Sequence, residues 1–163
     1  MLLKIFSYLP LSDRKSIRLV CWDWYRAVSH HSILRIEKLV CVREQDKKRI
    51  FHFLTKMDHI RPNLEFHGLS IDRISARFWR KRGYPIQTLT FVNCKFTSKA
   101  AKSVIEHCNL MKELSLQGCS GFFSCDVFNY CTKKKLARNS LESLRIENDA
   151  NINDYTFEQI FRV

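Results

Sequence analysis

Leucines recur at a fixed interval along most of this 163-residue chain. Leu39, Leu64, Leu89 and Leu114 stand 25 residues apart, and Leu144 follows after a step of 30. A second apolar residue stands two positions after each leucine: Cys41, Phe66, Phe91, Leu116 and Ile146. A fixed period in this range is typical of stacked repeats, in which each unit buries its apolar face only against its neighbours. Such arrays present a long surface to a partner, so the pattern favours binding over catalysis.

The two most regular copies predict that each repeat is a strand followed by a helix. Ile86–Cys94 and Met111–Cys119 both fit the pattern L-x-x-L-x-L-x-x-C. Alternation of apolar and polar residues inside this pattern predicts a short strand with one buried face. Between the two copies, residues 97–108 carry apolar side chains at helical spacing, and Thr97 or Ser98 can cap the helix that this spacing predicts.

The remaining copies fit in part and predict the same order of elements. Their strands are expected around Ile36, Leu39 and Cys41, around Leu64, Phe66 and Leu69, and around Leu141, Leu144 and Ile146. The helices after them are expected to bury Ile50, Phe51, Leu54 and Met57, then Ile71, Ile74, Phe78 and Trp79, and finally Tyr155, Phe157, Ile160 and Phe161. The interval from Leu114 to Leu144 is five residues longer than the others, and we expect the added residues in the basic stretch 133–139.

This pattern resembles the cysteine-containing leucine-rich repeat over residues 36–163. The resemblance implies an α/β fold, a curved solenoid of about five strand-helix units with strands on the concave side and helices on the convex side. Outward positions of the concave strands are implied to contact a target: Glu65, His67, Thr90, Val92, Asn93, Ser115, Gln117, Arg145 and Glu147. Because no polar capping repeat is visible before Val163, we expect the array of residues 31–163 to be truncated at this end.

Residues 1–30 do not fit the repeat and predict three short helices. The first is amphipathic, stops at Pro10, and contains Leu2, Leu3, Ile5, Phe6 and Leu9. Ser12 or Asp13 can cap the second, which is expected to run through Val20, and the third contains Cys21, Trp24, Tyr25 and Val28. By spacing alone these helices form an ordinary small core. A segment below about 40 residues rarely folds without support, however, so apolar surface left exposed here indicates a binding site.

The segment Leu2–Trp24 resembles the F-box, which reads L-x-x-I-F-x-x-L-P, an acidic residue opening a second helix, and L-x-x-V-C-x-x-W. These positions hold Ile5, Phe6, Leu9, Pro10, Asp13, Val20, Cys21 and Trp24. F-box proteins dock onto the Skp adaptor of cullin–RING ubiquitin ligases. The resemblance implies that the residues in that interface, or holding it together, are Leu2, Leu3, Ile5, Phe6, Leu9, Pro10, Ile17, Val20, Cys21 and Trp24.

The chain departs from the F-box pattern at two places. The Leu-Pro and acidic residue that usually begin the motif are missing, so we expect an N-terminally truncated F-box that has lost some adaptor contacts. Trp22 stands where the family usually has a polar residue. Trp22 is either an additional contact to the adaptor or packs against Ile33 and Leu34, and we favour packing because large aromatic side chains are mostly buried.

An F-box followed by leucine-rich repeats implies a substrate-recognition subunit of an SCF-type E3 ubiquitin ligase. In that role the F-box holds the adaptor, the repeats hold the target, and other subunits transfer ubiquitin, so this chain is not expected to be an enzyme. The alternative is a non-catalytic leucine-rich-repeat scaffold that does not engage the ligase.

The chain is strongly basic, with 28 Lys and Arg against 16 Asp and Glu and a net charge of +12. Basic clusters stand at residues 47–49, 77–82 and 133–138. They favour an acidic or phosphorylated target, although solvated helix faces explain them equally simply. Nucleic-acid binding is not favoured, because aromatic and basic residues are not interleaved along the predicted strands.

Cysteine and histidine usage favours neither metal nor catalysis. Seven cysteines show no CxxC pair and no zinc-like spacing, which predicts reduced thiols in a cytoplasmic or nuclear protein without metal or cofactor. His30 and His31 are expected in a loop, and His107 at a helix end. The start lacks the features of a signal peptide, and no apolar run reaches the roughly 18 residues that cross a membrane.

Overall fold

The computed structural model describes residues 2–34, 38–42, 47–57, 62–124, 127 and 141–148. The chain divides into two compact units, Met1–Leu39 and Val40–Val163, and each is described here by itself. Three expectations fall outside the described residues: the first strand position at Ile36, the basic stretch 133–138, and the final helix from Tyr155 to Phe161.

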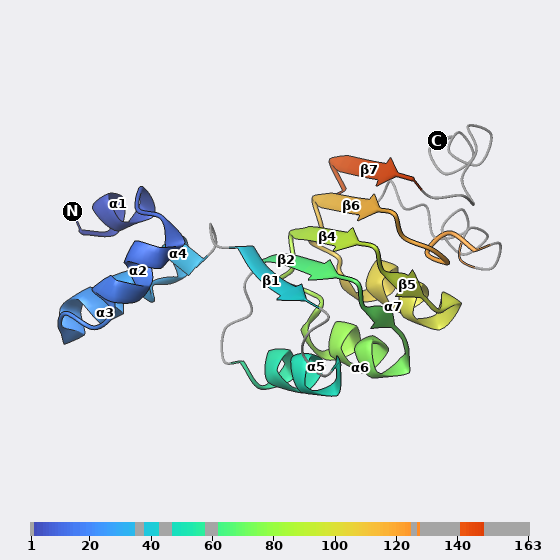
Figure 1. Ribbon diagram of the computed structural model, residues 1–163, viewed down its shortest axis with the longest axis horizontal. Helices are drawn as coiled ribbons and strands as arrows, with labels where there is room; N and C mark the ends of the chain where they lie inside the picture. The colour runs from blue at the N-terminus through green and yellow to red at the C-terminus, as the bar shows by residue number, and fades with distance from the viewer. Residues whose placement is uncertain are drawn as a thin grey trace. The chain divides into compact units, whose positions relative to one another are not determined.

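The first unit contains four short helices (Figure 1), which are α1 (Leu2–Ser7), α2 (Leu11–Ile17), α3 (Trp22–Val28) and α4 (His31–Leu34). The expected cap and length of α2 were wrong. Pro10 occupies the N-cap, no side chain caps the helix, and the helix ends before Arg18 rather than running through Val20. The fixed φ of proline suits the entry to a helix, so a side-chain cap is not required. His31 begins α4 instead of lying in a loop.

A small core and one buried arginine hold these helices together. Phe6, Val28 and Ile33 are buried, and Leu9, Ile17, Trp24 and Ala27 pack against them. The rings of Phe6 and Trp24 meet edge to face, with centroids 5.3 Å apart. Arg14 is buried, and its Nε donates to the carbonyl of Leu9 (2.8 Å) while Nη2 donates to that of Ser7 (3.0 Å). Arg14 thereby satisfies carbonyls at the end of α1 that lack a partner within the helix.

The second unit is mixed α/β, with a five-stranded sheet in the order β1-β2-β4-β6-β7 (Figure 1). Its strands are β1 (Lys38–Val42), β2 (Asn63–His67), β4 (Thr88–Val92), β6 (Glu113–Gln117) and β7 (Ser143–Glu147). Pairing is parallel from β2 through β7. A second, two-stranded parallel sheet of β3 (Ser70–Ile71) and β5 (Lys95–Phe96) was not expected from the sequence.

Three ten-residue helices lie along one side of the sheet (Figure 1): α5 (Lys47–Lys56), α6 (Arg73–Arg82) and α7 (Ser98–His107). Ile71 was expected in the second of these helices, but it lies in β3, and α6 begins two residues later. The expected cap of α7 is confirmed, since the hydroxyl of Thr97 accepts from the N–H of Ala100 at 3.3 Å.

The strand register follows the leucine period. Leu64 aligns with Leu89, Leu89 with Leu114, and Leu114 with Leu144. A residue with positive φ follows each of the strands β2, β4, β6 and β7: Gly68 (64°), Asn93 (52°), Gly118 (58°) and Asn148 (56°). Glycine and asparagine adopt this left-handed conformation most readily, so the turn recurs at the same place after β2, β4, β6 and β7. Residues 25 apart therefore have equivalent backbone positions.

An aromatic cluster fills the space between helices and sheet. Trp79 is completely buried, and its ring lies 4.7 Å from Phe78, 5.7 Å from Phe66, 6.1 Å from Phe91 and 6.2 Å from Phe51. These contacts confirm the expectation that Phe78 and Trp79 are buried core residues of a helix. The core therefore joins α5 and α6 to the strands β2 and β4.

Buried cysteines join successive repeats. The thiol of Cys94 donates to the carbonyl of Phe66 at 3.4 Å, and the thiol of Cys119 donates to that of Phe91 at 3.3 Å. Both contacts reach back to the preceding strand. A small side chain with a weak donor fits this position, as the sequence pattern predicts.

Candidate functional site

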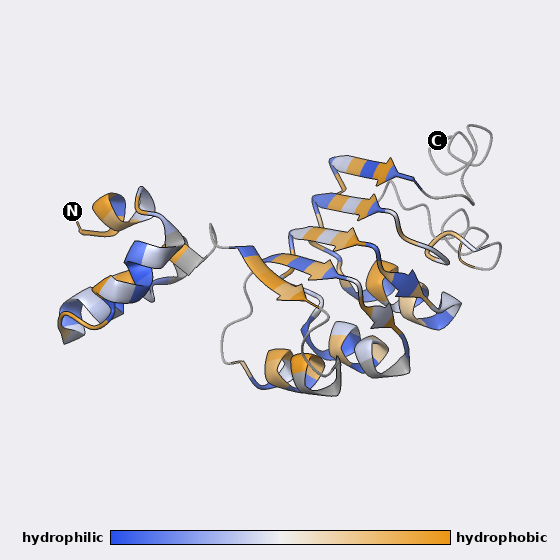
Figure 2. Ribbon diagram, in the orientation of Figure 1, coloured by the Kyte–Doolittle hydropathy of each residue, from blue (hydrophilic) through white to orange (hydrophobic). Residues whose placement is uncertain are grey.

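Among the described residues of the first unit, more large apolar side chains are exposed than are buried. Its exposed apolar side chains are Leu2, Leu3, Ile5, Tyr8, Leu19, Val20, Trp22 and Tyr25, which we call the apolar surface of the first unit. Leu19 is 87% exposed, Tyr8 78% and Trp22 69%. Figure 2 colours much of α1 as hydrophobic. Exposed apolar side chains in such number are typical of a surface that a partner protein covers.

The residues expected to serve the adaptor interface divide into two groups. The exposed group can contact a partner directly: Leu2, Leu3, Ile5, Pro10, Val20 and Cys21. The second group contributes to the core of the unit, with Phe6 fully inside it and Leu9, Ile17 and Trp24 packed against it. Residues of the second group shape the unit, and their replacement disturbs its fold before it disturbs a contact.

The expectation that Trp22 packs against Ile33 was wrong. The Trp22 side chain is 69% exposed and stacks on Tyr25, with centroids 5.2 Å apart and planes 15° apart. Residues three apart share a helix face, so Trp22 and Tyr25 form one stripe of α3. The other stripe, Trp24 and Val28, already occupies the core. Helical spacing within α3 was the signal that could have placed Trp22 and Tyr25 outside.

The residues expected to contact a target lie, with one exception, in two rows across a single face of the sheet. One row is Glu65, Thr90, Ser115 and Arg145, and the other is His67, Val92, Gln117 and Glu147. Asn93 is the exception, because it follows β4 in the left-handed turn and its N–H donates to the carbonyl of Gln117 at 2.7 Å. The turn conformation is a sufficient reason for asparagine there, and a contact to a target remains a prediction.

Part of this face was not predicted from the sequence. A third row, formed by Asn63, Thr88, Glu113 and Ser143, precedes the two expected rows. In β1 the side chains of Val40 and Val42 are 50% and 39% exposed. The signal was available, since alternation from Leu39 and Cys41 puts both valines on the opposite face. Figure 2 shows the same alternation along β6 and β7.

Charges on the sheet face are mixed. Glu65 lies 2.5 Å from His67, and the Arg145 Nε lies 4.0 Å from the Glu147 carboxylate. Beside β6, Lys112 donates to Glu142 at 2.8 Å, and this hydrogen bond raises the pKa of Lys112. A face that carries Glu65, Glu113 and Glu147 beside Arg145 does not select a strongly acidic partner.

Among the cysteines that the structure describes, Cys21 is exposed and four others are buried. Burial raises the pKa of Cys41 to about 11 and also raises the pKa of Cys108. The pKa of Cys94 is raised first by its hydrogen bond to Cys119 and then by burial. A raised pKa keeps a thiol protonated near neutral pH, and only the thiolate is nucleophilic.

We therefore expect Cys21 to react with a maleimide at pH 8 before any other described thiol. The test uses a chain in which Cys125 and Cys131, which lie outside the described residues, are replaced by serine. Mass spectrometry of the native protein should show one rapid addition, which Cys21→Ser removes. Rapid reaction of a second thiol in the native state would contradict this assignment of buried cysteines.

None of the helices that the structure describes could span a bilayer, since the longest have ten residues. The described side chains also form no cluster of three potential metal ligands. No curated protein matches the chain. Residues 1–35, which contain the four helices of the first unit, match the F-box-like family. The chain therefore begins with an F-box-like domain.

Proposed function

We propose that this chain is a substrate-recognition subunit of an SCF-type cullin–RING ubiquitin ligase. The F-box-like domain binds the Skp-type adaptor, and residues 31–163 bind a target protein. The proposal rests on one observation above all: the first unit has a small core of its own, yet eight further large apolar side chains lie exposed on its surface. Full burial of one such side chain contributes about 1.5–3 kcal/mol, so an adaptor that covers several of them gains a favourable free energy of binding from each.

The strand-helix units support the interpretation of residues 31–163 as leucine-rich repeats. Supporting features are the parallel register at a 25-residue step, the left-handed turn after β2, β4, β6 and β7, and the cysteine thiols that donate to the preceding strand. In this proposal the outward face of the sheet contacts the target. Ubiquitin transfer then depends on proximity within the assembly and not on a catalytic residue of this chain.

Co-purification with a Skp-type adaptor tests the proposal, and Cys21 provides the site-specific readout. We expect the complex to survive gel filtration and the maleimide reaction of Cys21 to become at least about tenfold slower when the adaptor is bound, because the adaptor covers this exposed thiol. The rate at which Cys21 reacts with maleimide in the unbound chain serves as the reference.

A variant with an added N-terminal Leu-Pro-x-Glu turn separates weak binding from no binding. If neither form co-purifies and the Cys21 rate is unchanged in both, the ligase-receptor proposal is wrong. The non-catalytic scaffold would then be the better account, because it requires the repeats but not the adaptor.

A further inference from the structure

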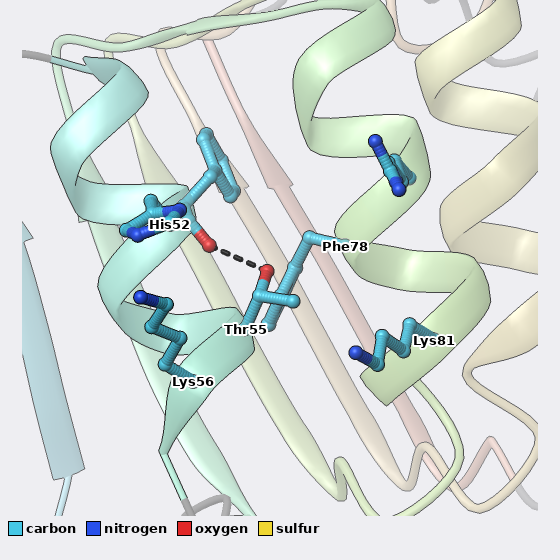
Figure 3. Close-up of a pocket in the computed structure, with 7 residues that line it drawn as sticks. His52, Thr55, Lys56, Phe78 and Lys81 are labelled. Carbon is cyan, nitrogen blue, oxygen red and sulfur yellow. Dashed lines mark hydrogen bonds between the residues drawn. The ribbon is translucent and has the colours of Figure 1, made fainter.

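A groove of about 470 Å³ lies between α5 and α6, on the helix layer and away from the sheet face (Figure 3). Its lining residues are Phe51, His52, Thr55, Lys56, Arg77, Phe78 and Lys81. Phe51 and Phe78 form an apolar floor, and both are almost completely buried by the core beneath. In Figure 3, Thr55 and Lys56 come from α5, and Phe78 and Lys81 come from α6 on the other side of the groove.

Both walls of this groove are cationic. Neither α5 nor α6 contains an acidic residue, and the exposed Lys56, Arg77 and Lys81 all line the groove. Arg82 differs from them, because its Nε and Nη2 both donate to the carbonyl of Thr55, at 3.2 and 3.0 Å. Arg82 therefore joins α6 to α5, whereas the cations of the walls project around the open space.

The cationic surface continues across α7. Two shallower depressions of about 400 and 360 Å³ follow the groove and are lined by Arg77, Arg80, Lys99 and Lys102. Arg77 lines both the groove and the first depression, and Arg80 and Lys99 line both depressions. Glu106, the acidic residue of α7, also lines the second depression, and its carboxylate lies 4.0 Å from His107. The cations outnumber this carboxylate, so the path across the three helices is predominantly cationic. The cations repel one another, and an elongated anion bound along them would lower that repulsion.

The buried floor of the groove favours a peptide over a nucleic acid. Single-stranded nucleic acids gain affinity by stacking bases on exposed aromatic rings, but the Phe51 and Phe78 side chains are only 2% and 1% exposed. An extended peptide presents alternate side chains to opposite sides, so its acidic groups can meet the cationic walls without any aromatic surface for stacking. We infer that the groove between α5 and α6, with its extension across α7, binds an extended acidic segment of a partner protein.

This inference goes beyond the proposed function, since it does not depend on adaptor binding by the first unit. It also places the charge-selective contact on the helix layer, whereas the sheet face carries mixed charges. Helices pack about 10 Å apart and an extended chain advances about 3.3 Å per residue, so about six residues span the distance between the axes of the first and third helix.

Fluorescence anisotropy of a labelled peptide of about ten residues, in which glutamate alternates with valine and serine, tests the inference with the full chain. We expect Lys56→Glu/Lys81→Glu to weaken binding by about tenfold or more, because charge-assisted contacts are lost and repulsion replaces them. The matched control Lys15→Glu/Lys95→Glu changes the net charge equally at exposed positions outside the groove and should alter affinity less than about twofold.

Three results would overturn the inference. Equal weakening by both double variants means that net charge, and not the groove, governs binding. Unchanged binding of a peptide with glutamine in place of glutamate means that charge is not recognised. Tighter binding of an oligothymidylate of equal charge, lost in Lys56→Glu/Lys81→Glu, assigns the groove to nucleic acid instead. Urea denaturation of each variant verifies that the fold is retained, and loss of adaptor binding affects none of these readouts.

Discussion

Replacing Trp79 by alanine is expected to lower the free energy of unfolding of the second unit by about 3–5 kcal/mol. The side chain is fully buried, and four aromatic rings lie within 6.2 Å of its centroid. Alanine would leave a cavity beneath both α5 and α6, because these rings can close over the lost volume only in part. Urea denaturation followed by circular dichroism measures the loss.

Trp79→Phe is the informative control. The Trp79 Nε1 has no hydrogen-bond partner among the described residues, and a buried unsatisfied donor costs about 1–3 kcal/mol. Phenylalanine removes this donor while retaining most of the ring contacts, so its cost should be well below that of alanine. A Trp79→Phe variant as unstable as Trp79→Ala would show that the indole makes a contact that the structure does not account for.

The second large effect concerns adaptor binding, which the double variant Val20→Ala/Trp22→Ala is expected to weaken by about a hundredfold or more. Central apolar and aromatic side chains of an interface typically contribute about 2–4 kcal/mol each when removed. Val20 and Trp22 are 61% and 69% exposed, so their replacement should change stability by less than about 0.5 kcal/mol each. Isothermal titration with the purified adaptor measures the affinity.

Two further variants make this test specific. Tyr84→Ala removes a side chain of similar exposure (63%) from the second unit and should leave adaptor affinity unchanged. Phe6→Ala should unfold the F-box-like domain, because Phe6 is 2% exposed and stacks edge to face on Trp24. If Val20→Ala/Trp22→Ala retains full affinity, the adaptor does not use this surface.

The sequence predicted the register of the sheet because one physical constraint dominates it. Parallel strands stacked at a fixed period must align equivalent residues, so the spacing of Leu64, Leu89 and Leu114 sufficed. The ends of helices were less predictable, since they depend on the backbone conformation and hydrogen bonds of a few local residues. Ile71 has the spacing of a helical core residue, yet the pairing of β3 with β5 takes it into a strand.

The candidate surfaces were predictable where alternation alone decides which side a residue faces. Alternation was sufficient for the target-contact rows of the sheet. It was not sufficient for Trp22, because its exposure depends on which face of α3 packs against the small core. The cationic groove was not predicted from the sequence, because the 25-residue period was considered only for apolar positions. Applied to polar ones, it aligns His52 with Arg77 and Lys56 with Lys81, each 25 residues apart.

The regular register also holds across the longest step of the repeat. Glu113 pairs with Ser143 and Gln117 with Glu147, although 30 residues instead of 25 separate the partners. The added length is therefore absorbed between the strands and leaves their alignment intact, whereas a single residue gained within a strand would reverse every side chain beyond it. Evolution can thus lengthen one repeat of this chain, and so alter what that repeat offers to other molecules, without rebuilding its neighbours.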